Sequence, residues 1–330
     1  MLVITGGGGF IGSVLAAALN EAGQGDLVLV DDFGSGDKWR NIAKREFFEI
    51  VPIAGLFPWL DRFGEGVEAV FHLGANSSTT ERDADAIIAG NLNYSIALWR
   101  WCAAHERPLI YASSAATYGD GTQGFDDAGG LGALSRLRPL NLYGWSKHAF
   151  DRWAMRRAAA GEAPPLWAGL KFFNVFGPNE YHKGEMMSLV VKNWRRIAAG
   201  ETVRLFKSHR PDYADGEQRR DFVYVKDCAA AMLWLWRRGP GAGIDGIYNL
   251  GTGTARSFRD LIAATGAALG IEPKIEFVDI PAEIRPSYQY FTEARMERLR
   301  AAGYNAPFTP LEEAVRDCIT QYLVRPDPYL

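Results

Sequence analysis

The chain has 330 residues, of which 48% are hydrophobic and 23% are charged, and its formal net charge is -3. This composition is ordinary for a globular enzyme, and the charge gives no reason to expect nucleic acid as a partner. The longest apolar run, Cys228 to Trp236, is far shorter than the roughly 20 residues that span a bilayer. We therefore expect no membrane partner, and we see no secretory signal because no basic segment precedes the apolar start.

The three cysteines, Cys102, Cys228 and Cys318, are widely spaced along the chain. Their number and spacing give neither a disulfide framework nor a metal-ligand pattern, so we expect no metal site. Reduced thiols fit a cytoplasmic protein.

The amino-terminal stretch predicts a turn that binds a nucleotide. Residues 2–5 form an apolar run typical of a buried strand, and Gly6, Gly9 and Gly12 lead into a helical pattern over residues 13–20. Glycine lets the backbone turn tightly and approach a pyrophosphate, while the free N–H groups at a helix start bind phosphate.

A second predicted strand, residues 26–32, ends in Asp31 and Asp32. Asp31 lies close to the roughly 20-residue distance at which a dinucleotide-binding fold places an acid on the adenosine ribose. These carboxylates suit the free 2′-hydroxyl of NAD and would repel a 2′-phosphate. Lys38, beyond the flexible Gly34–Gly36, is either an exposed loop lysine or a point charge for the phosphate of NADP. The residues alone leave the two cofactors open.

Residues 69–75 predict a third buried strand, in which His72 is more typical of a satisfied core histidine than of a ligand. The polar loop that follows should face the cofactor, because open parallel sheets bind ligands beyond the carboxyl ends of their strands. Ser77 or Thr79 in this loop is also a candidate N-cap for the next helix. Residues 91–105 predict a helix.

A further strand over residues 108–114 ends in Ser113 and Ser114, and about one strand–helix unit later Tyr143 and Lys147 stand four residues apart. That spacing places both on one face of a helix. A lysine ammonium near a phenol favours the phenolate, so we expect the pKa of Tyr143 to lie below its reference value of about 10. Tyr143 would then accept a proton from an alcohol near neutral pH.

The second half of the chain predicts further α/β structure. A strand is expected over residues 166–176 and a strand with a turn over 247–253, and helices are expected over 185–200, 227–238, 257–269 (with Ser257 as its N-cap) and 310–323. A polar stretch, residues 209–218, separates two of these elements.

These motifs resemble the extended short-chain dehydrogenase/reductase superfamily, through Gly6, Gly9 and Gly12, the stretch Tyr111 to Gly119, and the pair Tyr143 and Lys147. The stretches 77–81, 172–178, 180–186 and 219–225 are similar to the ADP-L-glycero-D-manno-heptose 6-epimerase family. The resemblance implies conversion of ADP-D-glycero-β-D-manno-heptose to its L-glycero epimer at C6, through a transient ketone, for the lipopolysaccharide inner core. It also implies NADP as cofactor, with NAD possible, and a homo-oligomer, by resemblance a pentamer.

The same resemblance implies roles for individual residues. Tyr143 and Lys183 are the two acid/base groups, Ser114 is the hydroxyl that assists them, and Lys147 supports Tyr143. The implied cofactor-binding residues are Gly6, Gly9, Phe10, Ile11, Gly12, Asp31, Asp32, Lys38, Leu73, Gly74, Ala75, Asn76, Ser77, Asn91, Lys147, Val175 and Lys183. The implied substrate-binding residues are Asn174, Glu185, Lys192, Phe206, Lys207, Ser208, His209, Arg220 and Tyr288.

The chain departs from the family pattern at a few of these positions. Glu185 stands where a small hydroxyl residue is expected, and Lys192 where a histidine is often found. Gly90 stands where an asparagine is expected to touch the cofactor, which leaves Asn91 as its substitute, and the stretch 209–218 is longer than expected. Arg220 is the best substrate candidate because a guanidinium forks onto phosphate.

We therefore expect an α/β fold, a Rossmann-type doubly wound parallel sheet with a smaller α/β substrate-binding domain. The first domain is expected over residues 1–178 with a return segment at about 221–250, and the second over 179–220 and 251–330. Two other functions stay open: another nucleotide-sugar 4-epimerase or dehydratase, and a non-catalytic NADP-sensing protein. Loss of Ser114, Tyr143 or Lys147 would indicate the sensor, and all three are present.

Overall fold

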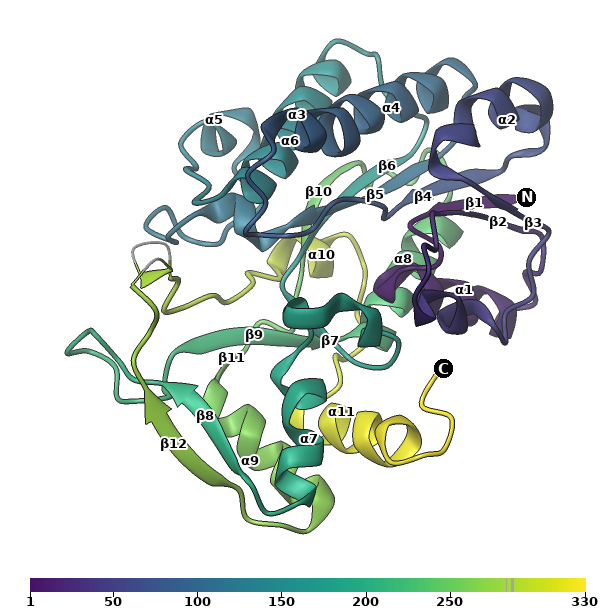
Figure 1. The fold of residues 1–330 in the computed structure, drawn as a ribbon. Helices are drawn as coiled ribbons and strands as arrows, with labels where there is room; N and C mark the ends of the chain where they lie inside the picture. The colour runs from purple at the N-terminus through teal and green to yellow at the C-terminus, as the bar shows by residue number, and fades with distance from the viewer. Residues whose placement is uncertain (283, 286–287) are drawn as a thin grey trace.

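The computed structural model describes residues 1–282, 284–285 and 288–330. Its largest element is a seven-stranded parallel sheet in the order β10-β6-β5-β4-β1-β2-β3 (Figure 1). Its strands are β1 (Leu2–Thr5), β2 (Leu27–Val30), β3 (Glu49–Val51), β4 (Ala69–His72), β5 (Leu109–Ser114), β6 (Trp167–Phe172) and β10 (Gly246–Leu250). Most of these strands are apolar and fully buried, as expected for a parallel sheet covered on both faces.

Helices cover both faces of the large sheet, with α4 and α6 on one face and α1 and α8 on the other (Figure 1). The helices of this half are α1 (Phe10–Glu21), α2 (Leu56–Phe63), α3 (Ala84–Ile87), α4 (Tyr94–Ala104), α5 (Gly130–Leu134), α6 (Leu142–Ala159), α8 (Val225–Arg238) and α10 (Glu297–Ala301). The strand order reverses at β1, which lies between β2 and β4. The carboxyl ends of such strands flank a crevice where doubly wound proteins bind ligands. The predicted fold class is confirmed.

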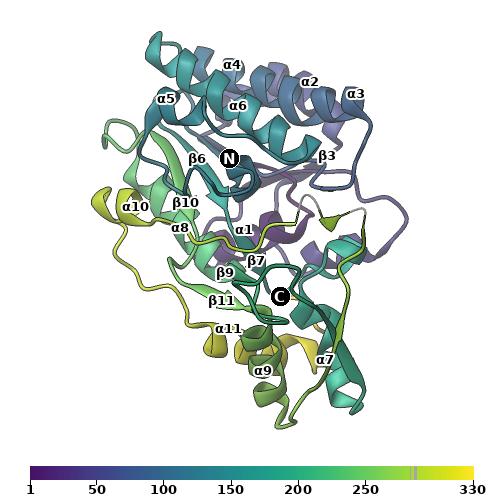
Figure 2. The same cartoon turned by 90° about the vertical axis from the view of Figure 1, so that its left-hand side faces the viewer.

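A smaller lobe carries a three-stranded sheet, β11-β9-β7, and a two-stranded parallel sheet, β12-β8. Its strands are β7 (Asn174–Phe176), β8 (Thr202–Phe206), β9 (Arg219–Tyr224), β11 (Ala255–Ser257) and β12 (Lys274–Val278), and its helices are α7 (Leu189–Ala198), α9 (Phe258–Leu269) and α11 (Leu311–Asp317). After β9 the chain returns to the large sheet through α8 and β10, and residues 288–296, which lead into α10, cross the molecule between the two lobes (Figure 2). The domain bounds predicted from the sequence stay a proposal.

Three predicted elements differ in the structure. The strand expected over residues 166–176 is two strands, because the chain leaves the large sheet after β6 and enters the smaller one as β7. The helix expected from residue 185 begins at Leu189, where Ser188 accepts a hydrogen bond from Val191 N–H. Neither Ser77 nor Thr79 caps a helix, because Asp83 accepts from Ala86 N–H and caps α3. Ser257 caps α9 as predicted, in a reciprocal pair with Asp260.

The three cysteines are free and buried. Within the ranges that the structure describes, no helix combines the length and apolar character that a membrane crossing requires.

Candidate active site

A cavity of about 780 Å³ opens along the carboxyl ends of β1, β4 and β5 and reaches Phe222 and Phe258 of the smaller lobe. Most of the predicted cofactor and catalytic residues line it. These are Gly6, Gly9, Phe10, Ile11, Gly12, Asp31, Asp32, Lys38, Leu73, Gly74, Ala75, Asn76, Ser77, Ser114, Tyr143, Lys147, Val175 and Lys183.

The turn between β1 and α1 has no space for side chains at its glycines. A Cβ at Gly12 would lie 2.1 Å from the carbonyl oxygen of Gly6. Gly6 itself has a φ of +70°, and its Cβ would lie 2.6 Å from the backbone nitrogen of Gly74. Gly9 precedes α1 without any side-chain cap, so N–H groups of the first turn face the cavity free for an anion. This cradle fits the pyrophosphate of a dinucleotide.

The end of β2 forms a charged group at the rim of the cavity. The buried Asp31 carboxylate accepts hydrogen bonds from Gly8 N–H at 2.9 Å and from Lys38 Nζ at 2.6 Å. Lys38 also donates to the carbonyl oxygen of Asp32 at 3.0 Å. Lys38 is therefore held beside the expected adenosine ribose and is not a free loop lysine.

The loop after β4 is held by Asn91. Its side chain accepts from Asn76 N–H and donates to the Asn76 carbonyl, both at 2.9 Å, and it also donates to Ser146 Oγ. Asn91 is buried and does not line the cavity, whereas Gly90 does. Asn91 thus shapes the loop from behind, because its amide is already occupied by protein partners.

His72 is a satisfied core histidine, as expected. Its ring nitrogens lie 2.7 Å from Thr5 Oγ1 and 2.8 Å from Ser95 Oγ. Burial, reinforced by the charge of Lys147, lowers the pKa of His72 to about 3, so the ring is neutral.

Ser114, Tyr143 and Lys147 meet where β5 faces the start of α6. Asn141 caps α6 by accepting from Gly144 N–H at 2.8 Å. A Cβ at Gly144 would lie 2.8 Å from the carbonyl oxygen of Ala116, so this helix start lies directly against the segment that follows Ser114. The Ser114 hydroxyl accepts from Ala116 N–H at 3.1 Å and lies close enough to the Tyr143 phenol to lower its pKa.

The expected low pKa of Tyr143 is wrong for this structure. Burial raises the pKa of Tyr143, because a phenolate loses its hydration, and the Ser114 hydrogen bond opposes this only in part. Burial also lowers the pKa of Lys147 to about 8, against the charge of Asp151. Desolvation, which acts on both groups, determines the direction of each shift and outweighs the effect expected from the spacing alone.

Lys183 lines the cavity from a different element, the 3₁₀ segment Tyr181–Met186. Its Nζ lies 5.0 Å from the centre of the Phe10 ring. Burial lowers the pKa of Lys183, and the nearby Glu180 opposes the shift. The buried Glu180 carboxylate accepts from the N–H and the hydroxyl of Ser188, both at 2.6 Å, and so anchors this segment to α7. The cavity thus has ionisable groups on two separate walls.

Residues 2–251 match the model of the NAD dependent epimerase/dehydratase family. The chain belongs to this family. Over their full lengths it is 46% identical to the ADP-L-glycero-D-manno-heptose-6-epimerase of Nitratidesulfovibrio vulgaris strain DP4 and 44% identical to the enzyme of that name from Fusobacterium nucleatum. The crystal structure of the Helicobacter pylori ADP-L-glycero-D-manno-heptose-6-epimerase matches 97% of this chain and 95% of its own, with a TM-score of 0.78 and 27% identity. These matches confirm the resemblance.

Most of the predicted substrate residues of this epimerase/dehydratase family member lie outside the cavity lining, and only Asn174 belongs to it. Those outside are Glu185, Lys192, Phe206, Lys207, Ser208, His209, Arg220 and Tyr288. Glu185 and Lys192 form an ion pair with each other at 2.9 Å, and the Glu185 carboxylate is almost fully exposed. Their predicted roles stay proposals.

Arg220 lies one layer behind the cavity wall. Its guanidinium is 5.5 Å from the Phe258 ring and 5.4 Å from the Tyr288 ring, and it donates to the carbonyl oxygen of Gln289. Phe258 and Gln289 line the cavity, so Arg220 supports the wall. Phe206 packs edge-on against Tyr288, with ring centres 5.8 Å apart.

The polar stretch 209–218 forms hydrogen bonds with neighbouring protein segments. Asp215 accepts from Ser208 N–H, Tyr290 accepts from His209 N–H, and His209 Nε2 accepts from Ile280 N–H. Lys207 faces Asp279 at 3.9 Å.

Sequence reasoning missed several residues of the cavity wall. They are Ile53, Tyr94, Met186, Met187, Phe258, Gln289 and Thr292 among others. Thr79 also lines the cavity, and it belongs to the polar loop that was expected to face the cofactor. Gln289 and Thr292 had no such signal, because they come from the non-repetitive segment that crosses between the lobes. In the part of the chain described, no group of three or more His, Cys, Asp or Glu residues is arranged to bind a metal ion.

Proposed function

We propose that the chain epimerises ADP-D-glycero-β-D-manno-heptose to its L-glycero epimer at C6, a step in the biosynthesis of lipopolysaccharide core precursors. The observation that carries this proposal is the 46% identity to an enzyme of that name over the whole of both chains. The cavity supports it, because one continuous space joins the glycine turn to ionisable groups on two walls.

Inversion at C6 requires a proton carrier on each side of the carbon, because the oxygen points in different directions before and after the change. Tyr143 on α6 and Lys183 on the 3₁₀ segment occupy the two walls. A bound nicotinamide supplies the acceptor and donor of the hydride. We assign Tyr143 to one epimer and Lys183 to the other, each taking the hydroxyl proton during oxidation and returning one during reduction.

The neighbouring residues prepare these two groups. Ser114 orients the substrate oxygen and offers Tyr143 a hydrogen bond. Lys147, whose pKa is lowered to about 8, lines the cavity beside Tyr143 and is positioned to hold the nicotinamide ribose. The lowered pKa of Lys183 makes its amine a usable base nearer neutral pH.

We propose NADP as the preferred cofactor, held by the glycine turn and by Lys38. The Lys38 ammonium is already at the ribose end of the cavity, where a 2′-phosphate would compete with Asp31 for it. NAD is the alternative, favoured by the carboxylates of Asp31 and Asp32. A mass spectrum of the dinucleotide released from the purified protein decides between them.

We also propose a cytoplasmic homo-oligomer, a pentamer by family resemblance. The three free, buried thiols support a reducing compartment. Analytical ultracentrifugation at several concentrations tests the assembly state.

The test of the reaction uses ADP-D-glycero-β-D-manno-heptose carrying deuterium at C6. We expect conversion to the L-glycero epimer with the deuterium retained, because the hydride leaves and returns within one site. Complete exchange of the label with water would contradict the scheme. Turnover of a UDP- or dTDP-sugar, with none of the ADP-heptose, would instead favour another nucleotide-sugar epimerase or dehydratase.

A further inference from the structure

A fully buried ion pair lies directly behind the site. Asp151 and Lys171 each have no exposed side-chain surface, and Lys171 Nζ lies 2.8 Å from Asp151 Oδ2. Neither residue lines the cavity. Replacing such a pair with well-packed apolar residues is often neutral or stabilising, so stability alone is a weak reason for its presence.

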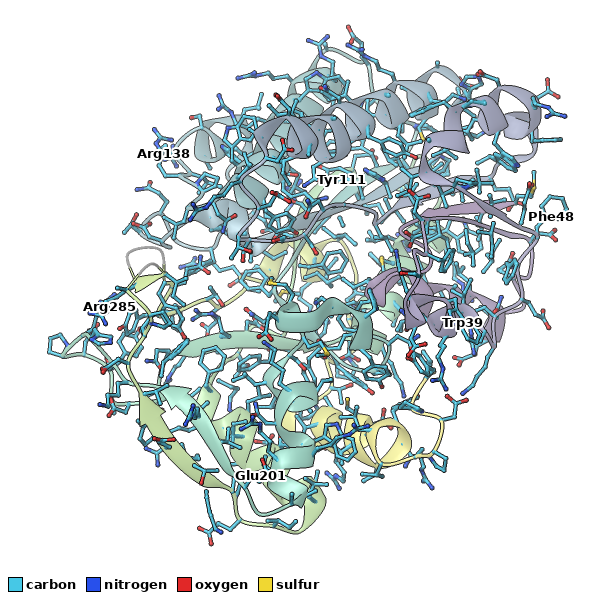
Figure 3. The ribbon with its side chains drawn as sticks, in the orientation of Figure 1. Trp39, Phe48, Tyr111, Arg138, Glu201 and Arg285 are labelled. Carbon is cyan, nitrogen blue, oxygen red and sulfur yellow. The ribbon has the colours of Figure 1, made fainter. Side chains whose placement is uncertain are left out.

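The Asp151 carboxylate joins the helix of Tyr143 to the strand of Ser114. Asp151 follows Lys147 by four residues on α6, so the two share a face of the helix. Its oxygens accept from Ser113 Oγ at 2.7 Å and from the Tyr111 hydroxyl at 3.1 Å, both on β5. Figure 3 shows Tyr111 inside the molecule, between the large sheet and its covering helices, whereas Trp39 and Phe48 lie at the periphery.

Lys171 completes the connection from β6. Besides Asp151, it donates to Thr117 Oγ1, and the Thr117 hydroxyl donates to the carbonyl oxygen of Ser114 at 2.7 Å. The network therefore holds Ser114 from both sides, through Ser113 before it and Thr117 after it. A change in this pair would move Ser114 relative to Tyr143.

The pair also sets the charge around Tyr143. The groups facing this region are Lys147, His148 and Asp151 on α6, His72 on β4, Tyr111 on β5, Tyr118 after β5, Lys171 on β6 and Lys183 on the 3₁₀ segment. The negative charge of Asp151 raises the pKa of both Tyr143 and Lys147. Lys171 carries the opposite charge 2.8 Å from Asp151 and therefore acts against it.

We propose that Asp151 and Lys171 are positioning residues, whose ion pair fixes α6 against β5 and β6 and thereby sets both the placement and the charge balance of Ser114, Tyr143 and Lys147. This inference rests on the proposed epimerase function. Neither residue touches the substrate or the cofactor.

The test compares Asp151→Asn with the double variant Asp151→Asn/Lys171→Met. Asp151→Asn removes a negative charge, so the pKa values of Tyr143 and Lys147 both fall, and the pH profile of kcat moves to lower pH by roughly one unit. The value of kcat falls roughly 10- to 100-fold, because Ser114, Tyr143 and Lys147 lose their relative placement. KM changes little, because the substituted residue does not line the cavity. The double variant removes both charges, and its pH profile returns towards that of the parent.

A second readout needs no substrate. The tyrosinate absorbance of each purified holoprotein is titrated with pH, and the same variant carrying Tyr143→Phe serves as its blank. The difference reports Tyr143 alone, and its midpoint is expected to fall in Asp151→Asn and to recover in the double variant. If the parent leaves ADP-heptose unchanged, the proposed function fails, while this titration still tests the ion pair.

Lys171→Arg keeps the charge and is the rescue variant. It should retain the parent pH profile, while Ser113→Ala, which removes one donor to Asp151 from a residue that also lines the cavity, should lower kcat. These two variants decide the question if Asp151→Asn does not fold. An unshifted profile and an unshifted tyrosinate midpoint in folded Asp151→Asn, or equal losses in Lys171→Arg and Ser113→Ala, would overturn the proposal.

Discussion

Tyr143 is the residue on which the proposed chemistry depends most directly. Tyr143→Phe removes the hydroxyl that exchanges a proton with the substrate and leaves the ring in place. We expect kcat for epimerisation to fall by roughly 100- to 10,000-fold, the usual contribution of a positioned acid/base group. Tyr304→Phe is the matched control, because Tyr304 packs against Trp234 and does not line the cavity. Turnover within a few-fold of the parent in Tyr143→Phe would remove Tyr143 from the mechanism.

Lys183 is the proposed second acid/base group, on the wall of the cavity formed by the 3₁₀ segment. Lys183→Met keeps the length of the side chain and removes its amine, so we expect a loss of epimerisation similar to that of Tyr143→Phe. The two variants differ when each epimer is supplied alone in a single turnover, because each variant should block oxidation of a different epimer. Lys274→Met, at an exposed lysine bonded to the Gly200 carbonyl, is the control. If both variants block the same epimer, the two-sided scheme is wrong.

At the scale of elements, the glycine turn is the part that sequence predicted best. Gly12→Ala would place a Cβ 2.1 Å from the Gly6 carbonyl oxygen, and backbone cannot move away as a side chain can. We expect the variant to lose its bound dinucleotide on gel filtration and to unfold at a lower temperature. Gly132→Ala is the control, because nothing lies within 4 Å of its Cβ and α5 accepts alanine. Retention of a full complement of dinucleotide in Gly12→Ala would contradict this account.

The elements also show where sequence reasoning succeeds and fails. The glycine turn and the Tyr143 helix were predictable, because each depends on the spacing of residues that are close together in the sequence. The split of residues 166–176 was not, since Phe172 at the end of β6 and Phe173 at the break are both apolar and both buried. The pairing of β8 with β12 joins residues about 70 positions apart in sequence, which no local pattern records.

The same distinction holds for the site. Glu185 and Lys192 were placed by family resemblance, and in this chain they satisfy each other because their charges are opposite. Asp151 and Lys171 belong to no local sequence motif. Only the fold brings Lys171 Nζ on β6 within 2.8 Å of Asp151 Oδ2 on α6.

At the scale of the whole molecule, two buried groups tie the returning chain to the rest of the fold. Asn249 on β10 donates to the carbonyl oxygens of Phe125 and Arg295 and accepts from the Tyr118 hydroxyl. Asp221 on β9 accepts from backbone N–H groups of residues 252, 253 and 294. Both groups bring segments distant in sequence together, so we expect the large sheet and the smaller lobe to unfold in one transition.

Asp127 offers a test of global stability, because its carboxylate is buried while it accepts from Asn249 N–H at 2.6 Å. Burial raises its pKa to about 6. An acid whose folded pKa exceeds its unfolded value of about 3.9 binds its proton more tightly when folded, so it lowers stability as pH rises from about 4 to about 6.

Asp127→Asn keeps an acceptor for Asn249 and removes this titration. We expect a gain of roughly 1–3 kcal/mol in the free energy of unfolding at pH 8 and a much smaller gain near pH 4. Denaturant unfolding at both pH values measures the difference, with the exposed Asp126→Asn as control. A gain that is equal at both pH values would show that hydrogen bonding, rather than the buried charge, determines the effect.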